Sequence, residues 1–394
     1  MKHPPPPRLL PMFGLLLAGF AQADSPDRPT GGSIAYVLTN MSWAMQSTSS
    51  AAECPKGLNE GTREQFKQLF PDNGTKRSLE STQLRREIDG FHPTTAAEPF
   101  VYREGEGPVA PGLDLDGIAS PEDFRSPDGH GGIDNQMHRV LGCTANYRGP
   151  DGPIRFFEDE MVLRENYNRV LVQISGVDSL KDDDAVEVRI FRGRDKVLVD
   201  AGGLKAVPGG TQRVDLRRGA NYIRETHGRI SGGVLRTEPV DLLYPWDVFY
   251  FPSDQYMYKA RLELALAPTA ATGLIGGYVD IETWYLHMIR NWSAHYQSYG
   301  NSSAPSIYKA MRRLADAEPD PQTGRNRAIS GALATVFTQV NIIESDPAEY
   351  AEALTRRRIA APYRGMPAER DPAEEQFELL PATPAVAAAN GGSR

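Results

Sequence analysis

The stretch Val186-Glu187-Val188-Arg189-Ile190 decides the fold class, together with Leu262-Glu263-Leu264-Ala265-Leu266 further along the chain. In both stretches, large apolar residues alternate with charged or small ones. Successive side chains of a β-strand point to opposite faces, so a period of two predicts strands that bury one face. The sequence therefore predicts a mainly β protein.

Further strand candidates surround these two stretches. They occupy residues 169–175, 196–200, 212–216, 233–243, 248–251 and 273–281, and glycine pairs at 202–203 and 232–233 predict turns between several of them. Parallel strands need crossover helices, for which these short connections leave no room. We expect an antiparallel β-sandwich-like core over residues 154–283, in a chain that is α+β overall.

The segments on either side of this core differ from it in composition. Residues 24–153 are rich in Gly, Pro, Ser and Asp and predict a loop-rich N-terminal arm. Residues 284–362 carry apolar residues at helical spacing, which predicts a helical C-terminal subdomain. Residues 363–394 consist mainly of Pro, Ala, Glu and Gly and predict a disordered tail.

The first 23 residues resemble a secretory signal. Lys2 and Arg8 precede or border an apolar run, which ends in the small-x-small pattern Ala21-Gln22-Ala23. We expect cleavage near Ala23 and export to the periplasm or the extracellular space. No later stretch reaches the roughly 20 apolar residues that a spanning helix requires, so we expect no membrane span.

The net charge of the chain indicates which classes of molecule it could bind. The chain has 394 residues, and its 43 Lys or Arg against 51 Asp or Glu give a net charge of −8. This acidic balance, without a basic stripe, argues against nucleic acid. A small molecule, a glycan or a protein remains as the unidentified partner.

Cys54 and Cys143 are predicted to form a disulfide. The chain has two cysteines, and an even pair in an oxidising compartment is typically bonded. The bridge would fasten the arm that is least able to form a core of its own.

Five aspartates lie between residues 114 and 134 and suggest calcium as a cofactor. Carboxylates that converge from loops are ligands that calcium prefers. The alternative is that these side chains start turns by accepting hydrogen bonds from nearby backbone amides. The candidate ligands are Asp114, Asp116, Asp123, Asp128 and Asp134.

His130, Asp134 and His138 follow one another at intervals of four residues. An unbroken helix would align them on one face and present them to a transition metal. Gly129, Gly131 and Gly132 disfavour such a helix. The competing interpretation is a short helix over residues 135–141, capped by Asp134.

Trp284 and Trp292 belong to the most aromatic helical stretch of the chain. Their rings could stack on a sugar or hold an apolar ligand, and both are candidate ligand-binding residues. Helical spacing of aromatic residues also fits simple packing against the sheet.

These observations favour an exported, non-catalytic binding or structural module that calcium stabilises. The sequence has no G-x-S-x-G elbow and no H-E-x-x-H motif, and we assign no catalytic residue. One alternative is a secreted hydrolase of polysaccharides that uses paired carboxylates, with candidates such as Glu158 or Asp159, and calcium as a structural ion. A second is a periplasmic metal-handling protein built on His130, Asp134 and His138.

Overall fold

The computed structural model describes residues 29–46, 50–59, 102–144, 147–148, 162–163, 169–246, 254–290 and 304–355. Five predicted features lie outside these residues. They are the secretory signal at 1–23, the strand at 248–251, the tail at 363–394, the carboxylates Glu158 and Asp159, and Trp292.

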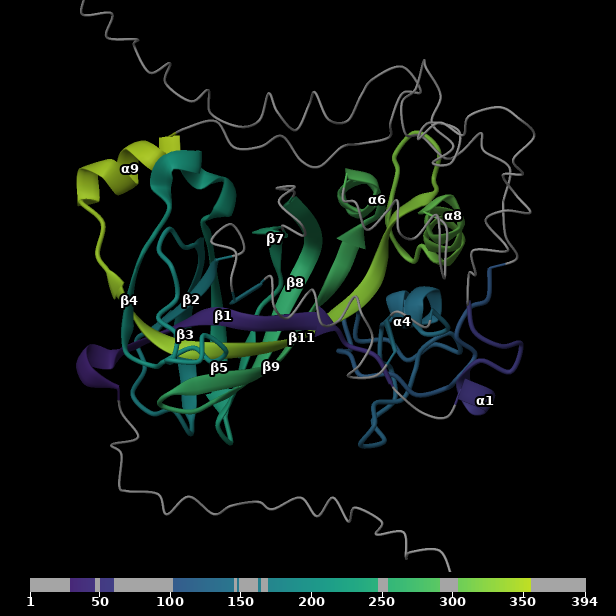
Figure 1. The fold of residues 1–394 in the computed structure, drawn as a ribbon, viewed down its shortest axis with the longest axis horizontal. Coiled ribbons are helices and arrows are strands. Elements are labelled where there is room, and N and C mark those ends of the chain that lie inside the picture. Colours follow the sequence, from purple (N-terminus) through teal and green to yellow (C-terminus); the bar gives the residue numbers. More distant parts are fainter. Residues whose placement is uncertain are drawn as a thin grey trace, which may run out of the picture.

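Eight antiparallel strands of the described chain close into a barrel (Figure 1). The last of them pairs with the first, in a register that runs from Ala35 opposite Val340 to Trp43 opposite Leu333. In order around the barrel, the strands are β1 (Ser33–Trp43), β2 (Val170–Ser175), β3 (Asp183–Arg192), β5 (Arg224–Ser231), β6 (Val234–Thr237), β8 (Asp254–Leu266), β9 (Ala270–Asp280) and β11 (Asn326–Ile343).

Three shorter strands extend this wall. β4 (Gly210–Arg213) pairs in parallel with the C-terminal end of β11. β7 (Val240–Pro245) continues the line of β6 and pairs with β8. β10 (Ala317–Pro319) pairs with the start of β11.

The expected β-sandwich is therefore wrong, whereas the mainly β class is confirmed. The difference comes from β1 and β11, which lie outside the 154–283 segment in which the sequence predicts the sheet. Nearly every side chain of β1 is buried, as are the side chains of residues 327–333 in β11. A strand that is buried on both faces carries no period-two signal, so the pattern that reveals β3 and β8 cannot reveal these two.

Both faces of these strands are buried because the barrel has an apolar interior and apolar layers outside it. The interior is lined by apolar side chains such as Tyr36, Val172 and Phe337, and barrels of eight strands are either packed with side chains or hold one small ligand. On one outer face, Val37 packs in a cluster with Leu216 and Ala353. Those two residues belong to the 3-10 helix η5 (Leu216–Tyr222) and to α9 (Pro347–Thr355).

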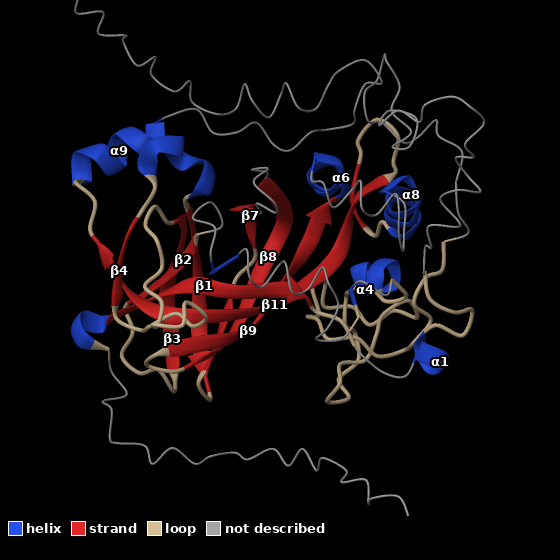
Figure 2. Cartoon of the chain, in the orientation of Figure 1, coloured by secondary structure: helices blue, strands red, loops and turns tan. Residues whose placement is uncertain are grey.

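Helices gather at one end of the barrel, as Figure 2 shows for α4 (Gln136–Leu141), α6 (Ile281–Arg290) and α8 (Ala304–Leu314). The short α1 (Ser50–Glu53) lies on the same side of the molecule, and η1 (Thr30–Gly32) precedes β1. α6 follows β9 directly, and the Thr283 amide donates to Oδ1 of Asp280 at 2.8 Å. None of the helices in the described part of the chain is both long and apolar enough to cross a membrane.

The cap of α4 differs from the sequence prediction. Oδ1 of Asn135, and not Asp134, accepts a hydrogen bond from the His138 amide, at 3.1 Å. The Asn135 side chain also donates to the Ala44 carbonyl at 2.9 Å and to the Pro111 carbonyl at 2.7 Å. The cap thereby fastens α4 to the end of β1. Asp134 does not cap the helix, and its carboxylate lies with those of Asp114 and Asp116.

Candidate metal centre

Asp114, Asp116 and Asp134 come together on the loop layer, which we define as residues 102–134. One carboxylate oxygen from each residue lies within 4.8 Å of the other two. Asp114 and Asp116 are exposed, and Asp134 is buried. Three of the five aspartates proposed as calcium ligands therefore converge.

Backbone pairing brings the two halves of this cluster together. The Asp134 amide donates to the Leu113 carbonyl at 3.0 Å, in an isolated antiparallel bridge. Leu113 in turn lies against β9, since a Cβ placed on Gly276 would be 2.9 Å from the Leu113 Cδ1 atom. Glycine at that position lets the loop approach the strand closely.

A tight turn holds the first two carboxylates. Gly117 has a positive φ of 77°, which glycine adopts without strain. Its amide donates to Oδ1 of Asp114 at 2.7 Å, and the Ile118 amide donates to Oδ1 of Asp116 at 2.7 Å. The turn-forming role is therefore present as well, and it leaves lone pairs on each carboxylate for a cation.

Asp134 is the most perturbed member of the cluster. Burial raises its pKa to about 6, and the Leu115 amide, which donates to Oδ2 at 2.6 Å, lowers it. The negative charges of Asp116, Asp123 and Asp316 raise it further. A divalent cation among these carboxylates would offset their mutual repulsion.

Asp316 lies outside this group of three, but its charge acts on Asp134, and no sequence motif indicated it. It lies just before β10, and its Oδ1 accepts a hydrogen bond from the Ser330 amide at 2.7 Å. Burial raises the pKa of Asp316 to about 6, and the charge of Asp116 contributes to this shift. Asp316 is far from residues 114–134 in the sequence, so no local spacing could have connected it with them.

The other two predicted calcium ligands have partners of their own. Asp123 accepts hydrogen bonds from the amide and the hydroxyl of Ser120, at 2.6 and 2.7 Å. Asp128 accepts one from the Ser126 hydroxyl, and its Oδ2 lies 3.4 Å from Nε2 of the exposed His130. Both aspartates shape turns in this structure.

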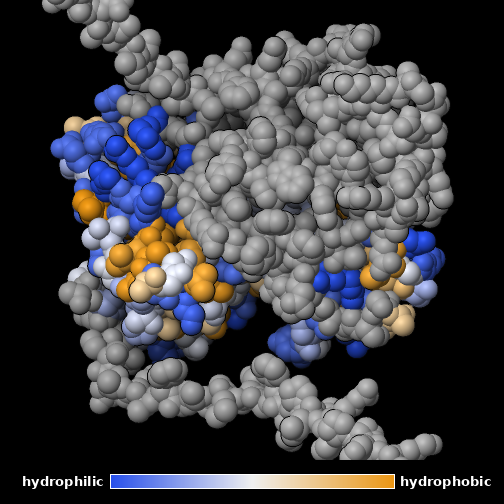
Figure 3. Space-filling model, viewed as in Figure 1, coloured by the Kyte–Doolittle hydropathy of each residue, from blue (hydrophilic) through white to orange (hydrophobic). Residues whose placement is uncertain are grey.

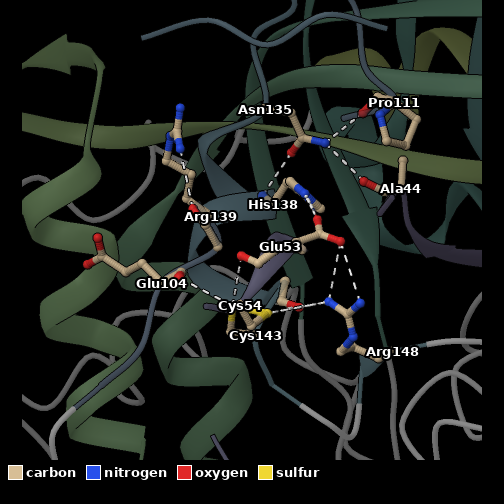
Figure 4. Close-up of polar contacts among 12 residues, drawn as sticks. Ala44, Glu53, Cys54, Glu104, Pro111, Asn135, His138, Arg139, Cys143 and Arg148 are labelled. Atoms are coloured by element: carbon tan, nitrogen blue, oxygen red, sulfur yellow. Dashed lines mark hydrogen bonds and ion pairs between the residues drawn. A yellow bond between two sulfur atoms is a disulfide. The ribbon is translucent and has the colours of Figure 1, made fainter. Parts of the chain in front are cut away.

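His138 has a separate environment, in which its side chain points toward Glu53 (Figure 4). Its Nε2 is 2.5 Å from Oε1 of Glu53, and both side chains are shielded from solvent. Arg148 approaches the other Glu53 oxygen at 3.5 Å. His130, Asp134 and His138 therefore have three different sets of partners, and Glu53 is a buried charged residue that no motif indicated.

The predicted disulfide between Cys54 and Cys143 is confirmed, with Cα atoms 5.6 Å apart. It joins the end of α1 to the residues that follow α4. Figure 4 shows that it lies beside the Glu53 pair, and the guanidinium of Arg148 donates to the Gly142 carbonyl at 2.5 Å. The disulfide and the contact between Glu53 and His138 thus both connect the region of α1 with that of α4.

Of the two candidate tryptophans, Trp284 is buried and forms part of the main apolar cluster. Trp292 lies outside the described residues. The packing interpretation of this stretch thus accounts for Trp284.

Comparison with protein-family models, with curated proteins and with solved structures found no match for this chain. The site itself therefore carries the functional argument.

Proposed function

We propose that this chain is an exported, non-catalytic binding or structural module whose loop layer is stabilised by calcium at Asp114, Asp116 and Asp134. The observation that carries the proposal is the convergence of the three carboxylates within 4.8 Å. All of the donors are oxygens, and they come from a loop and from the residue before a helix cap. Hard cations prefer such a set, and calcium tolerates its irregular geometry.

Calcium takes six to eight oxygen ligands, so carbonyl oxygens or water would complete the shell. The surroundings support the loop in this position. The guanidinium of Arg261 on β8 donates to the Asp114 carbonyl at 3.0 Å, and Leu115 packs in a cluster with Tyr258 and Tyr278 on the outer wall of the barrel. A cation bound here would act on a segment that already contacts the barrel.

The expected effect of the cation is to join two parts of the loop layer. Asp114 and Asp116 belong to the turn at Gly117, whereas Asp134 directly precedes the cap of α4. The same helix carries His138 and leads to Cys143. Calcium would therefore stabilise the region around α4 in addition to the disulfide.

An apolar area on the barrel supports the binding part of the proposal. Figure 3 shows it on the face that carries β4 and the C-terminal end of β11. Leu198 and Leu204 are 57% and 68% exposed, and Ile343 at the end of β11 is 48% exposed. Exposed apolar patches of this kind are typical of contact with a partner.

The two alternatives gain no support from the described residues. Glu158 and Asp159, the carboxylates of the hydrolase hypothesis, lie outside that part of the chain. His130 and His138, the histidines of the metal-handling hypothesis, have separate partners.

Calcium titration of the chelator-treated protein tests the cation site. We expect saturable heat in a calorimeter and a higher melting midpoint, because calcium at about 100 times its Kd would stabilise the fold by about 2.7 kcal/mol. Asp116→Asn should weaken calcium binding about tenfold or more, since it removes one ligand charge.

Asp123→Asn is the matched control, because Asp123 lies in the same loop layer but outside the convergent group. This variant should keep the wild-type response to calcium. Absence of binding heat, with equal midpoints in calcium and in chelator, would remove the cation from the proposal.

N-terminal sequencing of the protein recovered from outside the cytoplasm tests export. Cleavage after Ala23 predicts a mature chain that begins at Asp24. Recovery of the intact chain from the cytoplasm alone would contradict it.

A further inference from the structure

Gln255 on β8 is a buried amide without a hydrogen-bond partner. Its side chain is 0% exposed. Neither Oε1 nor Nε2 has a partner among the described residues. A buried amide that makes no hydrogen bond destabilises a protein, so a sequence that keeps one calls for an explanation.

The side chain of Gln255 points into the barrel. Side chains alternate along β8, and Met257, two residues on, belongs to the interior cluster. Tyr256 and Tyr258 point the other way and lie together in a cluster on the outer wall, with ring centroids 4.8 Å apart.

A row of aromatic rings begins at the strand neighbour of this interior position. Gln255 is the register partner of Tyr244 on β7. The Tyr244 ring centroid lies 5.9 Å from that of Trp246, which stacks on Trp43 of β1, also at 5.9 Å. A fully buried polar group thus lies beside a row of three aromatic side chains.

The position is at the end of the barrel that the helices cover. Met257 pairs with Val279 near the end of β9, which brings Gln255 to the level of the first residues of α6. Figure 1 shows α6 and α8 at this end of β8 and β9. Gly331 on β11 has no side chain, and the Trp43 ring lies close to its backbone: an added Cβ would be 3.1 Å from Cζ3 of Trp43. Large rings can therefore fit against this part of the wall.

We propose that this end of the barrel interior binds a small planar carboxamide or lactam, which pairs with both ends of the Gln255 amide. The ligand's N–H donates to Oε1, its carbonyl oxygen accepts from Nε2, and its ring packs against Tyr244, Trp246 and Trp43. The inference names a ligand class for the proposed binding module and rests on that function, but it does not require the cation site.

The chemistry of the lining selects this class. A glutamine amide offers one acceptor and two donors side by side, and a second amide matches them with two hydrogen bonds. Aromatic side chains favour a planar ring over an aliphatic chain. An ionised ligand would lose its hydration at a site with no solvent exposure, which disfavours carboxylates and ammonium groups.

Titration of the full-length protein with benzamide, followed by tryptophan fluorescence and by thermal melting, tests the proposal. We expect saturable quenching and a higher midpoint. Gln255→Leu should weaken benzamide binding about tenfold or more, because both hydrogen bonds are lost. The same variant should melt at the wild-type temperature or above it, because it removes the unpaired amide. Gln255→Met should behave in the same way if the leucine variant does not fold.

Gln212→Leu is the matched control. Gln212 on β4 is also buried, and its Oε1 has no partner among the described residues, but its Nε2 donates to the Lys196 carbonyl. This variant should bind benzamide as the wild type does. The inference is overturned if benzamide gives no saturable quenching, if Gln255→Leu keeps the wild-type affinity, or if Gln212→Leu loses as much.

The calcium response of the same sample separates the two proposals. A protein that melts higher in calcium but ignores benzamide keeps the cation site and loses the interior site. A protein that binds benzamide without any calcium response has the opposite outcome.

Discussion

Nε2 of His138 lies 2.5 Å from Oε1 of Glu53, at a place where neither side chain reaches solvent. The pair joins α4 to α1, and Glu53 is followed directly by Cys54 of the disulfide. The Glu53–His138 contact and the disulfide therefore both connect α1 and the residue after it with α4 and the residues that follow it.

Glu53→Gln should lower the free energy of unfolding by about 3 kcal/mol or more, because removal of one partner leaves the other polar group buried without its counterpart. Urea unfolding measures this loss, and a double-mutant cycle with His138→Asn isolates the coupling of the pair. Glu106→Gln is the control, since Glu106 forms an exposed pair with Lys56 over the same 2.5 Å distance. The control should show no measurable change. Equal effects of the two variants would contradict a structural role for the buried pair.

Replacement of both cysteines, Cys54→Ala with Cys143→Ala, should destabilise the protein by about 4 to 5 kcal/mol in the chain-entropy description. The bridge closes a loop with a sequence separation of 89 residues, so its removal enlarges the unfolded ensemble considerably. Denaturant unfolding of the wild type with and without reductant gives an independent value. The double variant should not respond to reductant, and a wild type that is equally stable when reduced would refute the prediction.

The stability of the protein should fall as the pH rises from about 4.5 to 7, partly because of Glu282. Burial raises the pKa of Glu282 from 4.5 to about 7, the hydrogen bond from Tyr308 lowers it, and the charge of Asp280 raises it again. Between these pH values the unfolded chain has lost the proton that the folded protein keeps, so folding takes up a proton and weakens with rising pH.

Glu282→Gln removes this dependence and retains an acceptor for the Tyr308 hydroxyl, which lies 2.5 Å from Oε1. Relative to wild type, the variant should gain about 3 kcal/mol between pH 5 and pH 8. Urea unfolding at both pH values measures the gain. Glu344→Gln, on the exposed segment before α9, controls for the loss of one charge. If the unfolding free energies of wild type and Glu282→Gln changed in parallel with pH, the prediction would be wrong.

Gly273→Ala should disrupt the barrel wall between β8 and β9. A Cβ at this position would lie 2.0 Å from the Glu263 carbonyl oxygen and 2.9 Å from the Leu264 Cα atom, both of which belong to the backbone. Because neither atom can move without shifting the strand, we expect a loss of about 3 kcal/mol or more in unfolding free energy. Gly131→Ala, where an added Cβ meets nothing within 4 Å, should be nearly neutral. Thermal melts compare the two variants, and a neutral Gly273→Ala would show that the strands are further apart than described.

Sequence periodicity predicts the strands that have one solvated face. β3 alternates between exposed and buried positions from Ala185 to Val188. The alternation of apolar and charged residues in the sequence predicts this pattern. β11 has seven consecutive buried residues from Arg327 to Leu333, which gives neither a period of two nor a period of 3.6. Closure of the barrel depends on that strand, so the sequence favoured the wrong architecture within the correct class.

The polar residues of the structure likewise include some that the sequence indicated and some that it did not. Asp114 and Asp116 were recognisable because they belong to a group of five aspartates between residues 114 and 134, and calcium prefers carboxylates that converge from loops. Asp316 reaches the neighbourhood of the cluster through β-pairing, and Glu53 reaches His138, outside the cation site, beside the disulfide; neither residue has a local signal. Gln255 was missed because it lies between the predicted strands at 248–251 and 262–266, in a part of β8 that the sequence pattern did not assign to a strand.

β11 pairs with β9 on one side and with β1 on the other, and it is the last strand of the barrel along the chain. Until residues 326–343 have been synthesised, β1 and β9 each present an unpaired edge to any strand nearby. Barrel closure must also wait for contacts between residues far apart in the sequence, which slows folding. A chain truncated before Asn326 is therefore expected to associate edge to edge with its own copies, and a chaperone that shields sheet edges would protect the unfinished protein.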